Sequence, residues 1–311
     1  MGEFYVIANM RIEEKIRISE NIIAHPFKTD QDLHETKNTN MDITVLRIAV
    51  PADFDLEVSK HVAMDDLFGK GFRFVTRYLS CLQLTELACY DFNQSSDRET
   101  MVPMGFVINK MHIGSSSFEE LTPAEIKTID ICSAATPFYT GSYGFDSVDF
   151  PAKGDFDKGW KLFEKCTEII GSGVVGEEKK ISILLKNILF RYYLAKTSVD
   201  ILYSVFNYMS IIESMYGDRE EIKGSIQRRV PKLLGDKTGN ISKFLKKMYD
   251  ERSVLAHNKT DYGYGMYGDR GIDGRERVIL ANMTGWLINI WIEKVYDGQT
   301  RDTIKKSTDS M

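Results

Sequence analysis

The spacing of apolar residues changes near the middle of the chain, and this change constrains the fold more than any other feature. Before residue 138, short runs rich in β-branched residues alternate in part between apolar and polar positions, which predicts strands. After residue 154, apolar residues recur at three- and four-residue steps, which predicts helices. We therefore expect an α+β fold class, with a mixed α/β domain at 1–150 and an all-helical domain at 155–300.

The same patterns predict individual elements. In the first domain we expect strands at Phe4–Ala8, around Ile16 and Ile18, at Ile43–Val50 and at Phe106–Ile113, and one amphipathic helix through Phe68, Phe72, Val75, Leu79 and Leu82. In the second we expect helices at Trp160–Ile170, Ile181–Leu194, Val199–Tyr216, Ile222–Leu234, Ile241–His257 and Arg275–Tyr296. A stretch rich in Gly, Ser, Asp and Pro, Phe138–Gly154, is the predicted boundary, and residues 301–311 are expected to form a flexible tail.

Composition sets the class of protein. With 311 residues and 43% hydrophobic content, each half can bury a core of its own. No apolar run reaches the length that spans a bilayer, and Glu3 stands where a signal peptide carries basic residues, so no membrane association and a cytoplasmic location are expected. Cysteines and histidines fall in no ligand spacing, which predicts no metal site and no cofactor: Cys81, Cys89, Cys132, Cys166, His25, His34, His61 and His112.

Charge is spread unevenly along the chain. The whole chain carries a net charge of -5. Residues 219–259 contain eleven Lys and Arg against five acids, a local balance of +6 that leaves -11 for the rest. A basic segment in an acidic chain favours binding of a polyanion at that segment.

Arg252 is the most informative residue of this basic segment. Ile241, Leu245 and Met248 form one apolar stripe, and a further step of four places Arg252 on the same side of the predicted helix. A charge in that position is costly to bury unless an anionic group meets it, so a partner is expected. His257 follows five residues later, near the predicted helix C-terminus, where the helix dipole favours the imidazolium form.

Five residues correspond to about 140° of rotation, so Arg252 and His257 do not share one helix face. Two arrangements bring both to one phosphate. Either the helix unwinds between Leu255 and Asn258, or the two residues come from facing copies of a dimer, which we favour.

Three segments, taken together, resemble a known family. They are Tyr-Met-Ser-Ile-Ile-Glu-Ser-Met-Tyr (208–216), Ile-Gln-Arg-Arg-Val-Pro-Lys-Leu-Leu (226–234) and Phe-Leu-Lys-Lys-Met-Tyr-Asp-Glu-Arg-Ser-Val-Leu-Ala-His (244–257). In sequence and in order they are similar to the Apea-like branch of the HEPN domains, over roughly residues 180–295. Ser253, directly after the arginine, is ordinary in that branch, whereas Asn258 stands where many members have Gly. Asn tolerates the left-handed conformation that ends a helix.

The resemblance implies a metal-independent endoribonuclease that works as a homodimer, often an effector of antiviral defence or a toxin. It implies that Arg252 binds the scissile phosphate and that His257 is the general acid or base, giving a 2',3'-cyclic phosphate. RNA is then the expected substrate, an antitoxin or activator an expected partner, and the first domain an expected sensor. A catalytically silent HEPN module, which dimerises or binds a nucleotide or a protein, is the alternative.

Each further candidate has two interpretations. Glu213 lies on a core-facing stripe and is expected to pair with Arg228, Arg229 or Arg252, or to orient Arg252 for catalysis. RNA contacts are expected from two tyrosines of a glycine-containing loop and from five basic residues, although a mobile loop and solvated helix faces explain them too: Tyr262, Tyr264, Lys243, Lys246, Lys247, Arg228 and Arg229.

A two-metal nucleotidyltransferase is a weaker interpretation. Gly141-Ser142 followed by Asp155 and Asp157 has the residue types of such a site, which requires the aspartates to lie on a strand. Pro151 and Gly154 interrupt the interval and argue against it.

Overall fold

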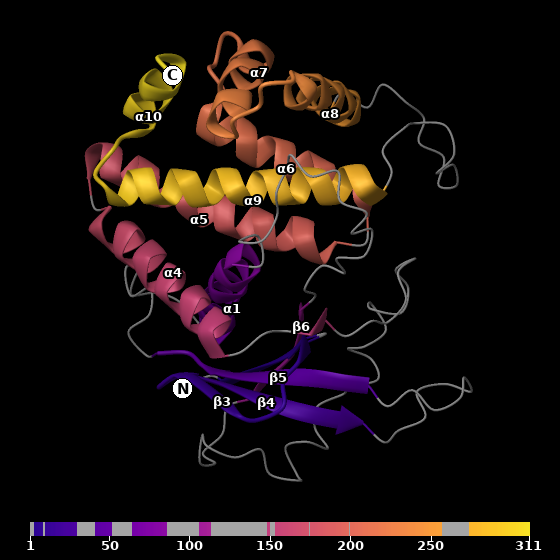
Figure 1. Ribbon diagram of the computed structural model, residues 1–311. Coiled ribbons are helices and arrows are strands. Elements are labelled where there is room, and N and C mark those ends of the chain that lie inside the picture. Colours follow the sequence, from indigo (N-terminus) through magenta and orange to yellow (C-terminus); the bar gives the residue numbers. More distant parts are fainter. Residues whose placement is uncertain are drawn as a thin grey trace. The chain divides into compact units, whose positions relative to one another are not determined.

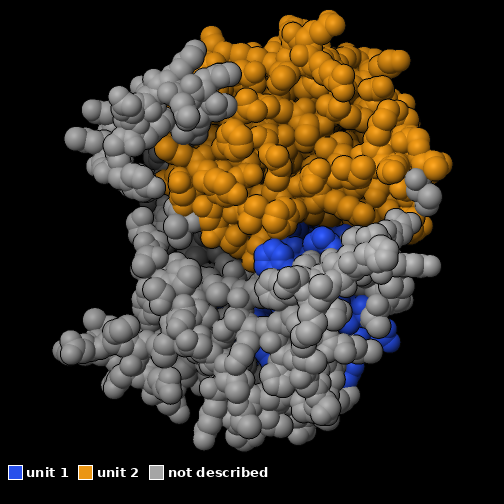
Figure 2. All heavy atoms as spheres, turned by 180° about the vertical axis from the view of Figure 1, so that it is seen from behind, with its two compact units in different colours: residues 1–86, 96–163 blue, residues 87–95, 164–311 orange. Residues whose placement is uncertain are grey.

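The computed structural model (Figure 1) describes residues 3–8, 10–29, 41–51, 64–85, 106–112, 148–149, 153–173, 175–198, 200–256 and 274–311. The chain divides into two compact units, residues 1–86 with 96–163 (unit 1) and residues 87–95 with 164–311 (unit 2), which are coloured in Figure 2. The predicted α+β class is confirmed, because the strands of the described residues precede a helical region.

Unit 1 contains an antiparallel sheet of five strands. Their order across the sheet is β3 (Ile16–Ser19), β4 (Ile22–Thr29), β5 (Met41–Ala49), β1 (Glu3–Ala8) and β6 (Phe106–His112). The four strand predictions are confirmed, whereas β4 was not predicted. Two short strands, β2 (Met10–Arg11) and β7 (Val148–Asp149), pair in parallel.

Helix α1 (Met64–Thr85) packs on β1, as its amphipathic period predicts. A Cβ atom at Gly71 would lie only 2.4 Å from Cε2 of the buried Phe4. Glycine therefore permits the close approach of this helix to the sheet.

The predicted boundary at 138–154 precedes the observed division, which lies within helix α4 (Lys153–Ser172), after Phe163. The first turns of α4 belong to unit 1 because their aromatic rings pack on α1. Phe163 meets Phe74 edge-on at 5.1 Å between ring centroids, and Trp160 lies 6.1 Å from Tyr78. Aromatic rings bury large apolar areas, so packing of these rings places the start of α4 in unit 1, although the change in composition comes before it.

Unit 2 is built around one central helix. α6 (Ile201–Tyr216) packs against α5 (Gly176–Thr197), α7 (Ile222–Leu233), α8 (Asn240–Ala256) and α9 (Gly274–Tyr296). The buried Tyr216 hydroxyl donates to the Leu287 carbonyl at 2.9 Å and ties α6 to α9. The six predicted helices are confirmed. No helix in the described part of the chain is both long and apolar enough to span a bilayer.

The prediction of a flexible tail at 301–311 is wrong. Thr300 caps a helix, α10 (Arg301–Asp309), by accepting a hydrogen bond from the Thr303 backbone N–H at 3.2 Å. Ile304 and Thr308, one turn apart, are buried against the rest of unit 2. The segment is mostly polar, so its apolar pattern does not predict a packed helix. It is held by charge pairs with distant residues, described below, which the local sequence does not reveal.

Candidate functional site

The outward side of α6 carries a stripe of mixed character. Asp200 begins the helix by accepting hydrogen bonds from the backbone N–H groups of Leu202 and Tyr203, at 2.8 and 3.1 Å. From there, Tyr203, Phe206 and Glu213 follow at helical spacing; Tyr203 is 44% exposed, whereas Phe206 and Glu213 are half-buried. This stripe places two aromatic rings and one carboxylate at the edge of the buried face of α6.

Arg252 from α8 lies over this stripe. Leu245 and Met248 lie on the buried side of α8, and Arg252 follows Met248 by one turn on that side. Its guanidinium carbon stands 5.4 Å from the centroid of the Phe206 ring, and its Nη2 is 3.0 Å from Oε2 of Glu213. Their side chains are 23% and 12% exposed. The expected partner of the partly buried arginine is therefore Glu213, and the ring beneath adds a cation–π contact.

The electrostatics of this pair are unusual for an ion pair. Burial raises the pKa of Glu213 above its ordinary 4.5, and the nearby Arg252 and Arg191 offset this only in part. Oε1 of Glu213 and Nε of Arg252 are both buried and have no hydrogen-bond partner among the described residues. The Arg252 side chain is nevertheless 23% exposed, and a planar guanidinium can pair with an anion such as a phosphate.

Arg191 is a member of this site that the sequence analysis missed. It is exposed on α5, close enough to Glu213 for its charge to lower the carboxyl pKa. The missed signal is the charge of α5, which carries five basic residues and no acid between Lys179 and Thr197. Two guanidinium groups thus act on a single carboxylate.

Several candidates lie outside the described residues: His257, Asn258, Tyr262 and Tyr264. Helix α8 continues without interruption to Ala256. Up to Ala256 the helix therefore does not unwind, and the expectation that His257 joins Arg252 concerns a residue outside the described range. Ser253 is half-buried on the helical turn next to Arg252.

The three lysines of α8 are not brought to Arg252. Lys243, Lys246 and Lys247 are exposed, on the side of α8 opposite the stripe formed by Leu245, Met248 and Arg252. Lys247 also forms an ion pair with Glu276 of α9 at 2.6 Å. A phosphate held by these lysines would lie on another face of the helix.

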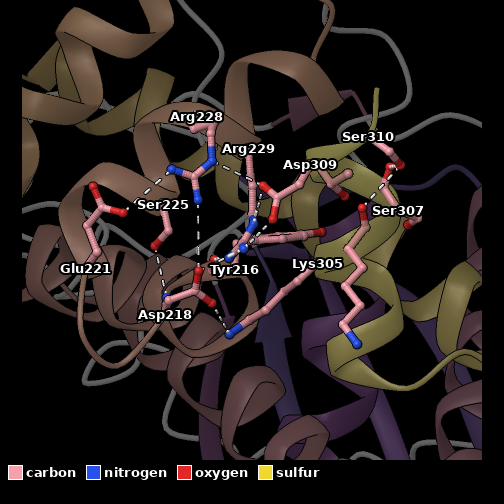
Figure 3. Close-up of polar contacts among 12 residues, drawn as sticks. Tyr216, Asp218, Glu221, Ser225, Arg228, Arg229, Lys305, Ser307, Asp309 and Ser310 are labelled. Atoms are coloured by element: carbon pink, nitrogen blue, oxygen red, sulfur yellow. Dashed lines mark hydrogen bonds and ion pairs between the residues drawn. The ribbon is translucent and has the colours of Figure 1, made fainter.

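Arg229 is a structural residue, contrary to the expectation that it contacts RNA. Only 5% of its side chain is exposed, and it donates to both carboxylate oxygens of Asp309 at 2.9 and 2.6 Å, and to the Tyr216 carbonyl at 2.7 Å (Figure 3). Its Nη2 also lies 2.8 Å from Asp218. Burial so complete leaves no donor of this side chain for a ligand.

Arg228 and Lys305 complete the cluster shown in Figure 3. Arg228 is 44% exposed and meets Asp309 at 3.2 Å, whereas the buried Lys305 donates to Asp218 at 3.1 Å and to the Gly217 carbonyl at 2.5 Å. Hydrogen bonds from Arg229, followed by those from Lys305, lower the pKa of Asp218 to about 2. The cations thus neutralise the carbonyl end of α6 and hold α10 in place.

The nucleotidyltransferase interpretation is not supported by the local structure. Asp155 and Asp157 lie within helix α4, not on a strand, while Gly141 and Ser142 fall outside the described residues. In the part of the chain that the structure describes, no three His, Cys, Asp or Glu side chains converge as metal ligands would. Cys81 and Cys166 are both buried.

Comparison of the chain with family models, with curated proteins and with solved structures gave no match. The family resemblance of the three segments in unit 2 therefore stays an expectation from the sequence, and the geometry around Arg252 has to be interpreted from its own chemistry.

Proposed function

We propose that unit 2 is an endoribonuclease of the HEPN type, which cleaves RNA in the cytoplasm without a metal ion, and that Arg252 and His257 carry out the reaction. The observation that supports it best is the state of Arg252. It is a partly buried guanidinium with an orphaned Nε, held over Phe206 and paired with a carboxylate whose pKa is raised. A site of this kind favours a second anion next to the arginine, and a phosphodiester is a suitable one.

The chemistry follows from the residue types. His257, as a base, removes the proton of the ribose 2'-OH, whose oxygen attacks the adjacent phosphorus while the bond to the 5'-oxygen breaks. An acid returns a proton to that leaving oxygen. Arg252 stabilises the charge that builds up on the phosphoryl oxygens. The products are a 2',3'-cyclic phosphate and a 5'-hydroxyl, so DNA, which lacks the 2'-OH, is spared.

A homodimer is part of this proposal. Helix α8 is regular up to Ala256. If a regular helix also included position 257, its side chain would be turned by about 140° from that of Arg252. A partner subunit that supplies the second residue meets this constraint without unwinding the helix. By the same resemblance, the protein acts as an antiviral effector or toxin controlled by an activator or antitoxin, with unit 1 as the sensor.

The test is cleavage of single-stranded RNA by the purified chain in EDTA. We expect cleavage to fall at least about a hundredfold in His257→Ala and in Arg252→Ala. The control is Lys306→Ala, which removes an exposed cation of α10 outside the basic segment and should cleave as the wild type does. Equal cleavage by wild type and His257→Ala would point to a contaminating nuclease and reject the proposal. Relief of growth arrest in cells that express Arg252→Ala provides an independent measurement.

A catalytically silent binding module is the second candidate, and one observation favours it. The ion pair of Arg252 with Glu213 at 3.0 Å provides the arginine with a partner inside the protein, as a purely structural pair would. The two candidates differ in the outcome of one experiment. A silent module dimerises in the wild type and in Arg252→Ala alike, and neither preparation cuts RNA.

A further inference from the structure

We propose that Tyr203 and Arg191 form the subsites that hold the RNA nucleotides next to the scissile phosphate, with Tyr203 stacking a base and Arg191 binding a backbone phosphate. The identity of the ligand as single-stranded RNA rests on the proposed function. The location of the subsites rests on the arrangement of α5, α6 and α8 around Arg252.

Tyr203 is an exposed aromatic residue on the same stripe of α6 as Phe206, the ring beneath Arg252. It precedes Phe206 by three positions on α6, so their side chains are neighbours on the helix surface, and Phe206 is the ring beneath the Arg252 guanidinium. The Asp200 cap accepts a hydrogen bond from the Tyr203 backbone N–H and fixes that turn. An aromatic side chain that is 44% exposed on a fixed backbone offers a stacking surface at a small entropic cost.

Arg191 lies level with the same part of α6. The antiparallel register of α5 and α6 is set by two contacts, the hydrogen bond from Ser204 to the Ala195 carbonyl at 2.9 Å and the ring contact of Tyr192 with Tyr208 at 5.9 Å. Arg191, next to Tyr192, is therefore level with the stretch of α6 between Phe206 and Glu213. It is exposed, and no carboxylate of the described residues lies within ion-pair distance of it.

This combination fits a single strand better than other polyanions. A nucleotide offers both a π-face and a phosphate, which match an exposed tyrosine and an exposed arginine on the helices that hold the Arg252–Glu213 pair and its neighbours. In a duplex the bases are stacked on one another and are not available to Tyr203. An anionic membrane surface offers phosphates but no ring to stack.

The test measures binding separately from cleavage. In the full chain carrying His257→Ala, fluorescence anisotropy with a labelled oligouridylate gives the dissociation constant. We expect Tyr203→Ala and Arg191→Ala each to weaken binding about tenfold, and Tyr203→Phe, which retains the ring, to bind like the parent. Arg191→Ala should also reduce the slope of log K against log salt by about 0.7, as loss of one phosphate contact does.

Matched controls exist in the same unit. Tyr296 on α9 is a tyrosine of nearly equal exposure, 45%, whose hydroxyl lies 3.1 Å from Glu168, and Lys306 is an exposed cation of α10, outside the basic segment. Tyr296→Ala and Lys306→Ala should bind RNA as the parent does. Equal losses in the controls and the test variants would indicate a diffuse charge or folding effect and overturn the subsites.

The remaining outcomes separate this inference from the proposed function. Binding that depends on Tyr203 and Arg191 without any cleavage by the wild-type chain supports the subsites and rejects the nuclease. Cleavage that proceeds at the same rate in Tyr203→Ala and Arg191→Ala, with unchanged affinity, overturns the subsites and leaves the nuclease standing. Absence of RNA binding, or tighter binding to duplex RNA or anionic vesicles than to the oligouridylate, also overturns them.

Discussion

Two consecutive arginines of α7 share two carboxylate partners, Asp218 and Asp309, and differ in burial, which allows a sharp prediction about stability. Arg229 is 5% exposed and makes contacts with Asp309, Asp218 and the Tyr216 carbonyl. Arg228 is 44% exposed and reaches Asp309 at 3.2 Å and Asp218 only at 4.0 Å. Removing one partner of a buried pair costs about 3–5 kcal/mol, whereas an exposed pair contributes about 0.2–1 kcal/mol.

We therefore expect Arg229→Ala to lower the free energy of unfolding by about 3–5 kcal/mol, and Arg228→Ala by less than about 1 kcal/mol. For a domain of this size, each kcal/mol corresponds to roughly 2–4 °C in Tm, so Arg229→Ala should lower the Tm by about 6–20 °C. Urea titration followed by circular dichroism measures the first quantity, and a thermal scan the second. Similar losses in the two variants would refute the argument that burial decides the contribution of each arginine.

Three further predictions concern the same unit. A chain ending before Thr300 should lose at least as much stability as Arg229→Ala in urea titration, because it lacks α10 altogether. Unchanged stability would mean that α10 contributes nothing to the folded unit, as a flexible tail would. The pKa of Asp218, about 2 in the folded state against an ordinary 3.8, gives stability that is lost as the pH falls from 4 to 2, and an Asp218→Asn variant should lack this acid dependence. Burial raises the pKa of Glu213, so the folded state binds that proton more tightly and stability falls as the pH rises above 4.5; Glu213→Gln should flatten this part of the stability profile, and an unchanged profile would contradict it.

Much of the fold could be predicted because periodicity reports burial directly. The helical steps of Ile222, Ile226 and Val230 predicted α7, and the short apolar run Phe4–Ala8, with its β-branched residues, predicted β1. The same stripe could have placed Arg229 in the interior, since it follows Ile226 by three positions and Ile222 by seven. A count of basic residues along the chain does not distinguish Arg229 from its exposed neighbour, and for that reason it was misassigned to RNA.

Other features depend on contacts between segments far apart in sequence. The nine-residue α10 has little apolar surface, and it is held largely by charge pairs that join Asp309 to α7, about eighty positions earlier. Arg191 belongs to the candidate site only because α5 and α6 pack side by side. The partner of Arg252 was expected from the cost of burying a charge, and Glu213 was among the candidates, but the choice of Glu213 required the tertiary structure.

The buried Arg229 and the partly buried Arg252 of unit 2 show opposite electrostatic balances, and this contrast is the strongest argument that only Arg229 is purely structural. Around Arg229, Asp218 and Asp309 supply two carboxylates, the pKa of each is lowered, and α10 is held in place. Around Arg252, a single carboxylate faces two guanidinium groups, yet its pKa is raised and an arginine nitrogen lacks a partner. A site that served only stability would be expected to approach the first arrangement, because unsatisfied buried groups cost free energy. An added anion would stabilise the second arrangement, and the proposed function therefore places the phosphate of its RNA at Arg252.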